Sequence, residues 1–240
     1  MTKVRIHIES KIIKNVEINI TRSQYHYLVN VMRKKDGDKI LIFNENYGEW
    51  IALVSKKKKI ELIPLKKTER DERLLDIWVC FSLIKPKNIN YLVEKVSELG
   101  VSKFIPMITD YSLRTKIDIH RLRKIAIESV EQSHGIRVPN FGELINIENL
   151  LNDWDESRLI IFCDENTNNY FFDIEKINIR KKYAIFLGPV GGWSSHDRKT
   201  VQNLENQFCV SLGKRLLKAD TAAICAVSSL KLLIEKELNV

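Results

Sequence analysis

The feature that most constrains the fold is an alternation of strand-like and helix-like segments that begins near residue 74. Apolar runs of strand length occupy residues 74–83, 103–108, 159–163, 183–187 and 207–212. Apolar residues at helical spacing occupy residues 88–99, 121–132, 195–206 and 221–238. Strands that alternate with helices favour a parallel sheet covered on both faces, so residues 71–240 are predicted to form an α/β domain.

The first part of the chain has a different pattern. Apolar residues recur with a period of two through most of residues 3–67, which predicts short strands. One helical segment, residues 23–33, interrupts them behind an N-cap at Thr21 or Ser23. Short strands with a single helix predict a small β-barrel domain in residues 1–70, and a charged stretch that ends near residue 73 marks its boundary.

The net charge of +8 is confined to this first part of the chain. Residues 1–70 carry 16 Lys and Arg against 8 Asp and Glu, whereas the remaining residues carry 23 of each sign. A basic surface gains affinity for a polyanion by releasing its counterions, so the asymmetry favours binding to nucleic acid. The alternative is a solvated lysine-rich surface, and the four lysines at residues 56–59 are also compatible with a charged hairpin turn.

The chain lacks the sequence signals of membrane, secreted and metal-binding proteins. No run of 18 or more apolar residues occurs and no apolar signal core follows Met1, so a soluble, cytoplasmic protein is expected. His134 and His196 lack partners at metal-ligand spacing, so no metal site is predicted. The absence of C-x-x-C spacing and the apolar neighbours predict buried, reduced thiols at Cys80, Cys163, Cys209 and Cys225.

Two glycine-containing segments follow predicted strands. Three glycines occur in residues 188–192, directly after the strand at residues 183–187, and Gly213 follows the next strand. Ligands bind at the carboxyl ends of parallel strands, where glycines let the backbone approach a ligand closely, so both loops are candidate binding sites. Neither has the spacing of a P-loop or a dinucleotide-binding fingerprint. The alternative is a pair of tight strand-to-helix turns.

Four segments in the second part of the chain share their order and spacing with one known family. They are LVEKVSELGV at residues 92–101, AIESVEQS at 126–133, LGPVGG at 187–192 and LGKRLL at 212–217. In these segments the chain resembles the RsmE family of small-subunit rRNA uracil-N3 methyltransferases, and residues 33–50 resemble the family's PUA-like RNA-binding barrel. The resemblance implies a trefoil-knotted domain of the SPOUT class, S-adenosylmethionine as cofactor, and a uridine of 16S rRNA as the target.

The resemblance also implies which residues form the site. The residues expected to bind the cofactor, largely through loop backbone, are Leu187, Gly188, Pro189, Gly191, Gly192, Leu212, Gly213, Leu216 and Leu217. The residues expected to contact RNA are Arg33, Lys34, Lys35, Glu131, Gln132, Arg137 and Arg215. For the three of these at residues 131–137, a solvent-exposed helix end is the alternative.

Two charged residues are candidates for catalysis. Uracil N3 carries a proton that must leave before or during methyl transfer, so a base, or a cation that stabilises the uracil anion, is required. Lys218 would stabilise the anion or orient a carbonyl group, and Asp220 would orient Lys218. The alternative for Asp220 is an ordinary N-cap of the helix that follows it.

The sequence departs from the family pattern at four positions. Val190 stands where Glu is usual, Gly135 where an Arg commonly follows the Glu-Gln-Ser segment, and Lys218 and Asp220 where Arg and Glu are usual. Two alternatives therefore remain, a knotted methyltransferase for another RNA and a noncatalytic protein that binds RNA or ribosomes. The class usually dimerises and the last helix is apolar over more than one face, so a homodimer is expected.

Overall fold

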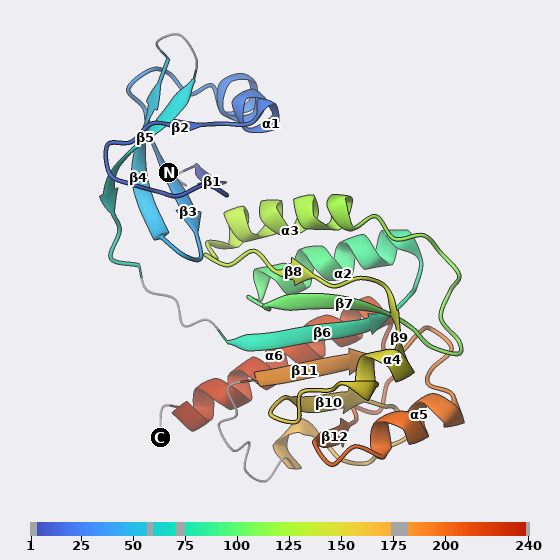
Figure 1. Ribbon diagram of the computed structural model, residues 1–240. Helices are drawn as coiled ribbons and strands as arrows, with labels where there is room; N and C mark the ends of the chain where they lie inside the picture. The colour runs from blue at the N-terminus through green and yellow to red at the C-terminus, as the bar shows by residue number, and fades with distance from the viewer. Residues whose placement is uncertain (1–3, 57–59, 71–74, 174–181, 239–240) are drawn as a thin grey trace. The chain divides into compact units, whose positions relative to one another are not determined.

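The computed structural model describes residues 4–56, 60–70, 75–173 and 182–238. The chain divides into two compact units (Figure 1). The first unit comprises Met1–Arg73 and Val130–Val138, and the second comprises Leu74–Ser129 and Pro139–Val240. The domain division at residues 70 and 71 stays a prediction, and the compact units differ from it in ending the first segment at Arg73 and in giving the nine residues from Val130 to Val138 to the first unit.

The first unit is a five-stranded sheet wrapped around one core. Its strands are β1 (Arg5–His7), β2 (Ile18–Asn19), β3 (Lys39–Asn44), β4 (Gly48–Ser55) and β5 (Glu61–Lys67). They are arranged in the order β1-β3-β4-β5-β2, with β1 parallel to β3 and the other pairs antiparallel. Both edge strands contribute to the same core as the centre, since Ile6, Ile18 and Ala52 belong to one buried cluster. The sheet is therefore curled, as a PUA-like barrel requires.

The predicted helix of the first unit is present but changes its winding. Its first turn, α1 (Arg22–His26), begins at Thr21, whose hydroxyl accepts a hydrogen bond from the Gln24 amide at 3.2 Å. The Gln24 side chain in turn accepts from the Thr21 amide at 2.9 Å, which completes a capping box. The helix continues as a π-helical turn, η1 (Tyr27–Val31), and Arg33 just beyond it has a φ of 52°. The lysines at 57–59 of the predicted hairpin turn lie outside the described residues.

A buried arginine fastens the segment Val130–Val138 to the first unit. The Arg5 side chain, 1% exposed, pairs with Glu49 at 2.8 Å. Its guanidinium also donates hydrogen bonds to the carbonyl groups of Val130, Glu131 and Gly135 at 3.0, 3.2 and 2.9 Å. The last turn of α3 (Ile119–Ser133) and the residues after it thus satisfy a cation that the barrel buries.

The second unit is built on a parallel sheet, as the alternating pattern predicted. Its strands are β6 (Asp76–Ser82), β7 (Lys103–Ile108), β8 (Asn140–Phe141), β9 (Ile145–Asn146), β10 (Leu159–Cys163), β11 (Lys182–Leu187) and β12 (Gln207–Val210). The order is β12-β10-β11-β6-β7-β8, and β9 also pairs with β7. Every pairing is parallel, so the predicted α/β class is confirmed.

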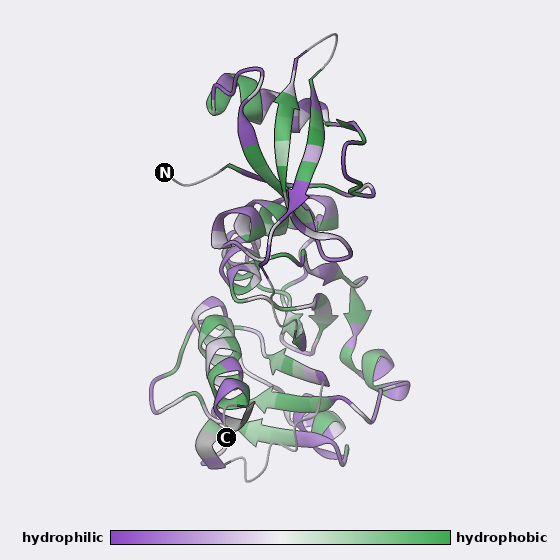
Figure 2. Cartoon of the chain, turned by 90° about the vertical axis from the view of Figure 1, so that its left-hand side faces the viewer, coloured by the Kyte–Doolittle hydropathy of each residue, from purple (hydrophilic) through white to green (hydrophobic). Residues whose placement is uncertain are grey.

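Helices cover both faces of this sheet. On one face α2 (Pro86–Glu98) packs against α6 (Ala219–Leu238), which contacts β11 and passes behind the sheet in Figure 1. On the other face α4 (Ile147–Asn152) and α5 (Ser195–Gln202) contribute Ile147, Leu151 and Val201 to a cluster with Phe162 and Phe186. Figure 2 shows the strands between these layers as mostly hydrophobic, as expected of strands buried on both sides.

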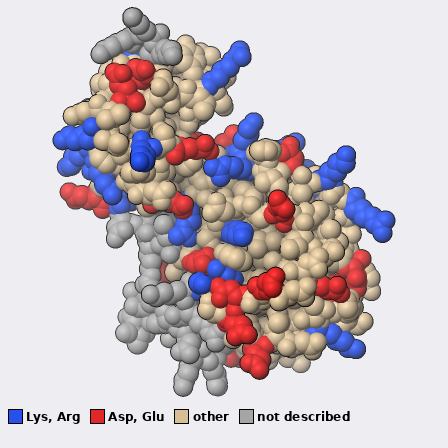
Figure 3. Space-filling view, viewed as in Figure 1, with Lys and Arg blue, Asp and Glu red and all other residues tan. Residues whose placement is uncertain are grey.

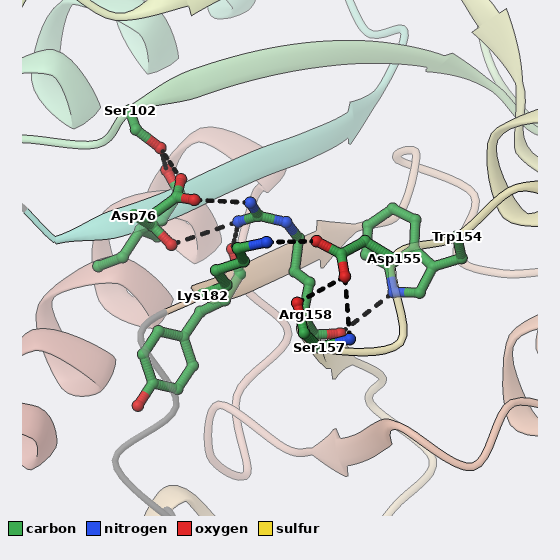
Figure 4. A network of polar contacts seen from close by, with 9 residues as sticks. Asp76, Ser102, Trp154, Asp155, Ser157, Arg158 and Lys182 are labelled. Atoms are coloured by element: carbon green, nitrogen blue, oxygen red, sulfur yellow. Dashed lines mark hydrogen bonds and ion pairs between the residues drawn. The ribbon is translucent and has the colours of Figure 1, made fainter.

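A polar cluster joins the strands at their amino ends (Figure 4). Arg158, just before β10, pairs with Asp76 of β6 at 2.7 Å and lies 3.6 Å from the centroid of the Trp78 ring. Lys182 of β11 pairs with Asp155 at 2.8 Å, and this bond holds the pKa of the Asp155 carboxyl well below its ordinary value. The cluster therefore holds together the amino ends of β6, β10 and β11, and the loops that follow these strands lie at their opposite ends.

All four cysteines are free. Cys80 and Cys163 are buried as predicted, and burial raises the pKa of both thiols well above the ordinary value. For Cys209 and Cys225 the prediction of burial was wrong, because both are half-buried, and partial burial raises the pKa of Cys209 to about 11. No helix among the described residues is long and apolar enough to cross a membrane.

Candidate functional site

A cavity of about 560 Å³ lies at the carboxyl ends of the parallel strands in the second unit. Its walls are the segments that directly follow β6, β10, β11 and β12. The segment after β6 contributes Ile84, Lys85 and Asn88. The segments after β10 and β11 contribute Cys163, Asp164, Glu165 and residues 187–193, and the segment after β12 contributes residues 211–213, 215–219 and 222. Four separate strands thus direct their following loops to one site.

All nine residues predicted to bind the cofactor line this cavity. Lys218 and Arg215 line it as well, whereas Asp220 does not. The predicted contacts therefore gather at one place in space, although their roles stay predictions. The volume falls in the range of about 300 to 1,000 Å³ that holds small ligands and cofactors.

Trp193 shapes the loop that follows β11. Its ring is 2% exposed, packs on Phe162 with centroids 4.6 Å apart, and donates from Nε1 to the Cys163 carbonyl at 2.7 Å. A methyl group added at Gly188 would lie 3.0 Å from this ring. An added side chain at residue 188 would therefore crowd the tryptophan, which favours glycine there. At Gly192 a φ of 75° and the Glu165 carboxylate, 2.7 Å from an added methyl group, disfavour any side chain.

Arg198 of α5 connects two walls of the cavity. Its Nε donates to Asp164 Oδ2 at 2.8 Å and its Nη2 to Asp164 Oδ1 at 3.1 Å, a two-pronged contact with a carboxylate whose side chain is 3% exposed. The same Nη2 lies 3.2 Å from Glu165 Oε1. Its Nη1 donates to the Trp193 carbonyl. The bond to Asp164 raises the pKa of Arg198 further. The loop after β10 and the loop after β11 are therefore held together by one cation.

The loop after β12 ends at the start of α6. Gly213 has a φ of 114°, a conformation that favours glycine, and a methyl group there would meet no atom within 4 Å. The Lys218 carbonyl accepts the Ala222 amide at 2.8 Å, which begins the helix, and the exposed Lys218 side chain lies at the cavity wall. Asp220, 9% exposed, sits in the first helical turn, where Oδ1 accepts from the Thr221 amide and Oδ2 from Asn88 Nδ2.

The residues predicted to contact RNA divide between the units. Arg33, Lys34, Lys35, Glu131, Gln132 and Arg137 belong to the first unit, and Arg215 belongs to the second. Among them Glu131 accepts the His7 amide at 2.8 Å and Arg137 lies 3.4 Å from Glu45, so both have partners within the unit. Figure 3 shows basic side chains gathered at one side of the first unit.

Both histidines considered for metal binding occupy other settings. His196 Nε2 lies 2.6 Å from Glu148 Oε1 on α4, and this hydrogen bond raises the pKa of the imidazole above 6.5. His134 has a φ of 63° in the turn after α3. Within the part of the chain that the structure describes, no group of three or more His, Cys, Asp or Glu side chains is arranged to hold a metal ion.

Sequence reasoning missed several residues of the cavity. Asp164 and Glu165 follow β10, and Lys85 and Asn88 follow β6, yet neither segment contains the glycines that drew attention to the other two loops. The rule that ligands bind beyond the carboxyl ends of strands applies equally to all four. Its application to every predicted strand would have found them.

The fold and the cavity define a class, an α/β protein with a ligand site at the carboxyl edge of its sheet and a curled β unit. Two family models match the chain, an RNA methyltransferase domain over residues 70–231 and an RNA methyltransferase PUA domain over residues 20–65. The chain belongs to this family of RNA methyltransferases, and the resemblance to the RsmE family is confirmed.

Several relatives match this chain over most of their length. Ribosomal RNA small subunit methyltransferase E of Rickettsia conorii is 27% identical over 232 residues, which cover 95% of each chain. The protein of that name from Buchnera aphidicola subsp. Schizaphis graminum is 29% identical over 242 residues, also 95% of each chain. The crystal structure of the Neisseria gonorrhoeae protein, bound to S-adenosyl methionine, superposes with a TM-score of 0.87 at 21% identity, covering 97% of this chain and 98% of that one.

Proposed function

We propose that this protein transfers a methyl group from S-adenosylmethionine to N3 of a uridine in 16S rRNA of the small ribosomal subunit. One observation carries the proposal: every residue expected to bind the cofactor lines a single cavity in a chain of the RNA methyltransferase family. Relatives that match 95% of this chain bear the name of a small-subunit rRNA methyltransferase, which supports the choice of substrate.

The residues around the cavity fit S-adenosylmethionine. The loops at 187–192 and 211–217 offer backbone amide and carbonyl groups, which suit an adenine ring and a methionine chain. Glu165, with 43% of its side chain exposed, meets Arg198 through Oε1 and can offer Oε2 to ribose hydroxyl groups that donate hydrogen bonds. Asp164 is different, because its carboxylate already accepts two bonds from Arg198. We infer that Asp164 shapes the site and that Glu165 binds the ligand.

Bound S-adenosylmethionine supplies an electrophilic methyl group on a sulfonium, so the protein chiefly has to align the acceptor and remove its proton. The N3–methyl bond forms as the sulfur–methyl bond breaks, the bonding electrons go to sulfur, and the N3 proton must pass to a base. Lys218, at the cavity wall, stabilises the negative charge that develops on the uracil carbonyl oxygens. Asp220 lies two residues further on, in the first turn of α6, where its carboxylate orients Lys218 or receives the proton.

The proposal also covers RNA binding, the knot, the oligomeric state and the cellular compartment. The first unit binds rRNA through Arg33, Lys34 and Lys35, and Gln132 and Arg137 add contacts from the segment Val130–Val138. The second unit holds the cofactor in a trefoil knot, as in the SPOUT class. The protein acts as a homodimer in the cytoplasm, where ribosomes are assembled.

The test is transfer of a labelled methyl group to small ribosomal subunits from cells that lack the protein, followed by nucleoside analysis. N3-methyluridine in the 16S rRNA is the expected product. Cofactor binding measured by calorimetry without transfer to these subunits would point to another RNA substrate. The absence of both binding and transfer would contradict the proposal and favour a noncatalytic RNA-binding role.

A further inference from the structure

Tyr111 is an exposed aromatic residue beside the cavity. It belongs to the loop after β7, and 57% of its surface is exposed. A methyl group added at Gly191, a cavity-lining residue, would lie 3.4 Å from Tyr111 Cβ. The tyrosine therefore stands against the loop that follows β11, at the rim of the proposed site.

The loop that carries Tyr111 is held on both sides. On one side the Thr109 hydroxyl donates to Ser82 Oγ at 3.0 Å, and the Leu113 amide donates to the Leu83 carbonyl at 2.9 Å. On the other side the Ser194 hydroxyl donates to Asp110 Oδ2 at 2.5 Å. The residues before and after Tyr111 are thus anchored to the carboxyl end of β6 and to the cap of α5. The chain uses several polar contacts to hold in place a loop whose central side chain faces water.

A second apolar side chain lies in the adjoining segment. Val190, next to Gly191 in the chain, is 76% exposed and lines the cavity. Three cations, Lys85, Arg215 and Lys218, line the same cavity, and its two carboxylates, Asp164 and Glu165, are both bound by Arg198. The rim therefore presents an aromatic ring and an apolar side chain near a group of three cations. Unstacked RNA bases bind to this combination, since the base stacks on an aromatic ring and its phosphates meet cations.

We propose that Tyr111 is the stacking residue for the target uracil, with Val190 forming the adjoining apolar surface. The proposal rests on the proposed function and names the residues that recognise its substrate. A second copy of the chain fits the rim less well. A two-fold contact centred on Lys85, Arg215 and Lys218 would bring these cations toward the same cations of the other copy, whereas RNA brings compensating negative charge.

The experiment compares three changes at one position with a matched control. Tyr111→Phe keeps the ring, Tyr111→Leu keeps only apolar surface, and Tyr111→Ala removes both. Tyr91→Ala is the control, because Tyr91 is 46% exposed on α2 and does not line the cavity. Each variant is tested for binding of a fluorescent uridine oligonucleotide, for methyl transfer to small subunits, for S-adenosylmethionine affinity and for mass in solution.

The expected loss for Tyr111→Ala is about 10- to 100-fold in oligonucleotide affinity and in kcat/KM for the RNA, with unchanged cofactor affinity. Tyr111→Phe should stay within a few-fold of the wild type, and Tyr111→Leu should resemble Tyr111→Ala. Wild-type oligonucleotide affinity and kcat/KM in Tyr111→Ala would overturn the proposal. Equal losses of affinity in Tyr111→Phe and Tyr111→Ala would overturn it as well. A change in the mass of the assembly that Tyr111→Ala forms in solution would also overturn the proposal and assign the residue to a subunit interface. If the wild type methylates no RNA, the proposed function fails, and the oligonucleotide affinities still decide the role of Tyr111.

Discussion

Asn88 and Asp220 are joined by a hydrogen bond of 2.8 Å from Nδ2 to Oδ2, although 132 residues separate them in the chain. The bond links the first turn of α2 to the first turn of α6 beside the cavity. It leaves the Asp220 carboxylate with partners on both oxygens, since Oδ1 accepts the Thr221 amide at 2.9 Å. Asp220 is therefore fixed in orientation, whichever role it has.

The change Asp220→Asn separates a catalytic role from a capping role. Asparagine keeps the Oδ1 acceptor for the Thr221 amide but carries no charge, and its Nδ2 cannot accept the hydrogen bond from Asn88, so the free energy of unfolding should fall by about 1 to 3 kcal/mol. If the carboxylate takes part in removing the N3 proton, kcat should fall on the order of 100-fold with unchanged cofactor affinity. Single-turnover methyl transfer and urea unfolding measure the two effects. An unaltered kcat would leave Asp220 as a helix cap only.

Under the proposed mechanism, Lys218→Ala should lower kcat for methyl transfer by about 100-fold, because it removes the cation proposed to stabilise the uracil anion. Lys214→Ala is the matched control, since Lys214 is exposed and close in sequence but does not line the cavity. Lys218→Arg should retain most of the rate, as Arg is usual at this position in the family. A Lys218→Ala variant that binds cofactor and RNA and methylates at the normal rate would remove Lys218 from the mechanism.

Gly188→Ala should both destabilise the second unit and weaken cofactor binding. The added methyl group would meet the buried Trp193 ring at 3.0 Å, and overpacking of this kind costs about 1 to 3 kcal/mol. Gly142→Ala is the control, since its nearest contact is an ordinary 3.4 Å to an Ile105 side chain. Chemical unfolding and calorimetry with S-adenosylmethionine report the two effects. Equal stability of the two variants would show that the tryptophan moves aside without cost.

Arg5→Ala should be among the most damaging single changes in the first unit. It leaves the Glu49 side chain, 6% exposed, without its cation, and it removes the donor for three carbonyl groups. Loss of one partner from a buried ion pair costs about 3 to 5 kcal/mol. Arg22→Ala, at an exposed position on α1, should change stability by less than about 0.5 kcal/mol. Thermal unfolding of both variants checks the difference, and similar melting temperatures would contradict the buried role.

The contact between His196 and Glu148 predicts a pH dependence in the link between α5 and α4. The hydrogen bond raises the pKa of His196 above 6.5, so the protonated form is favoured in the folded protein. Its small stabilising effect is complete below 6.5 and is lost as the pH rises through the folded-state pKa. NMR titration of the imidazole should give a value above 6.5 that returns to the ordinary value in Glu148→Gln. Identical titrations in the two proteins would rule out the pair.

The sequence predicted the elements whose signal is periodic. The strands at Leu159–Cys163 and Lys103–Ile108 lie where the apolar runs placed them, and the glycine loop after β11 lies at the predicted ligand site. By contrast, α4 has only six residues and β8 and β9 two each, which is too short to form a recognisable pattern.

The features that sequence could not supply depend on contacts between distant residues. Nothing near Arg5 indicates that its partners are carbonyl groups at residues 130–135, and nothing near Asn88 points to Asp220. Every residue carries a backbone carbonyl group, so the identity of a residue does not indicate that its carbonyl accepts a hydrogen bond. The reason for glycine at residue 188 is likewise a ring five positions further along the chain, which only the fold brings against it.

The partners of Arg5 also bear on the order in which the parts of the chain can fold during synthesis. A ribosome makes the barrel strands first, and domains generally fold as they emerge. Here the buried guanidinium acquires its last acceptor, the Gly135 carbonyl, only after more than half of the 240 residues have been made. The first unit thus completes its fold only when the segment Val130–Val138 has been made. A gene fragment that stops at the end of β5 would encode the pair of Arg5 and Glu49 without the three carbonyl groups that accept the remaining hydrogen bonds of the guanidinium.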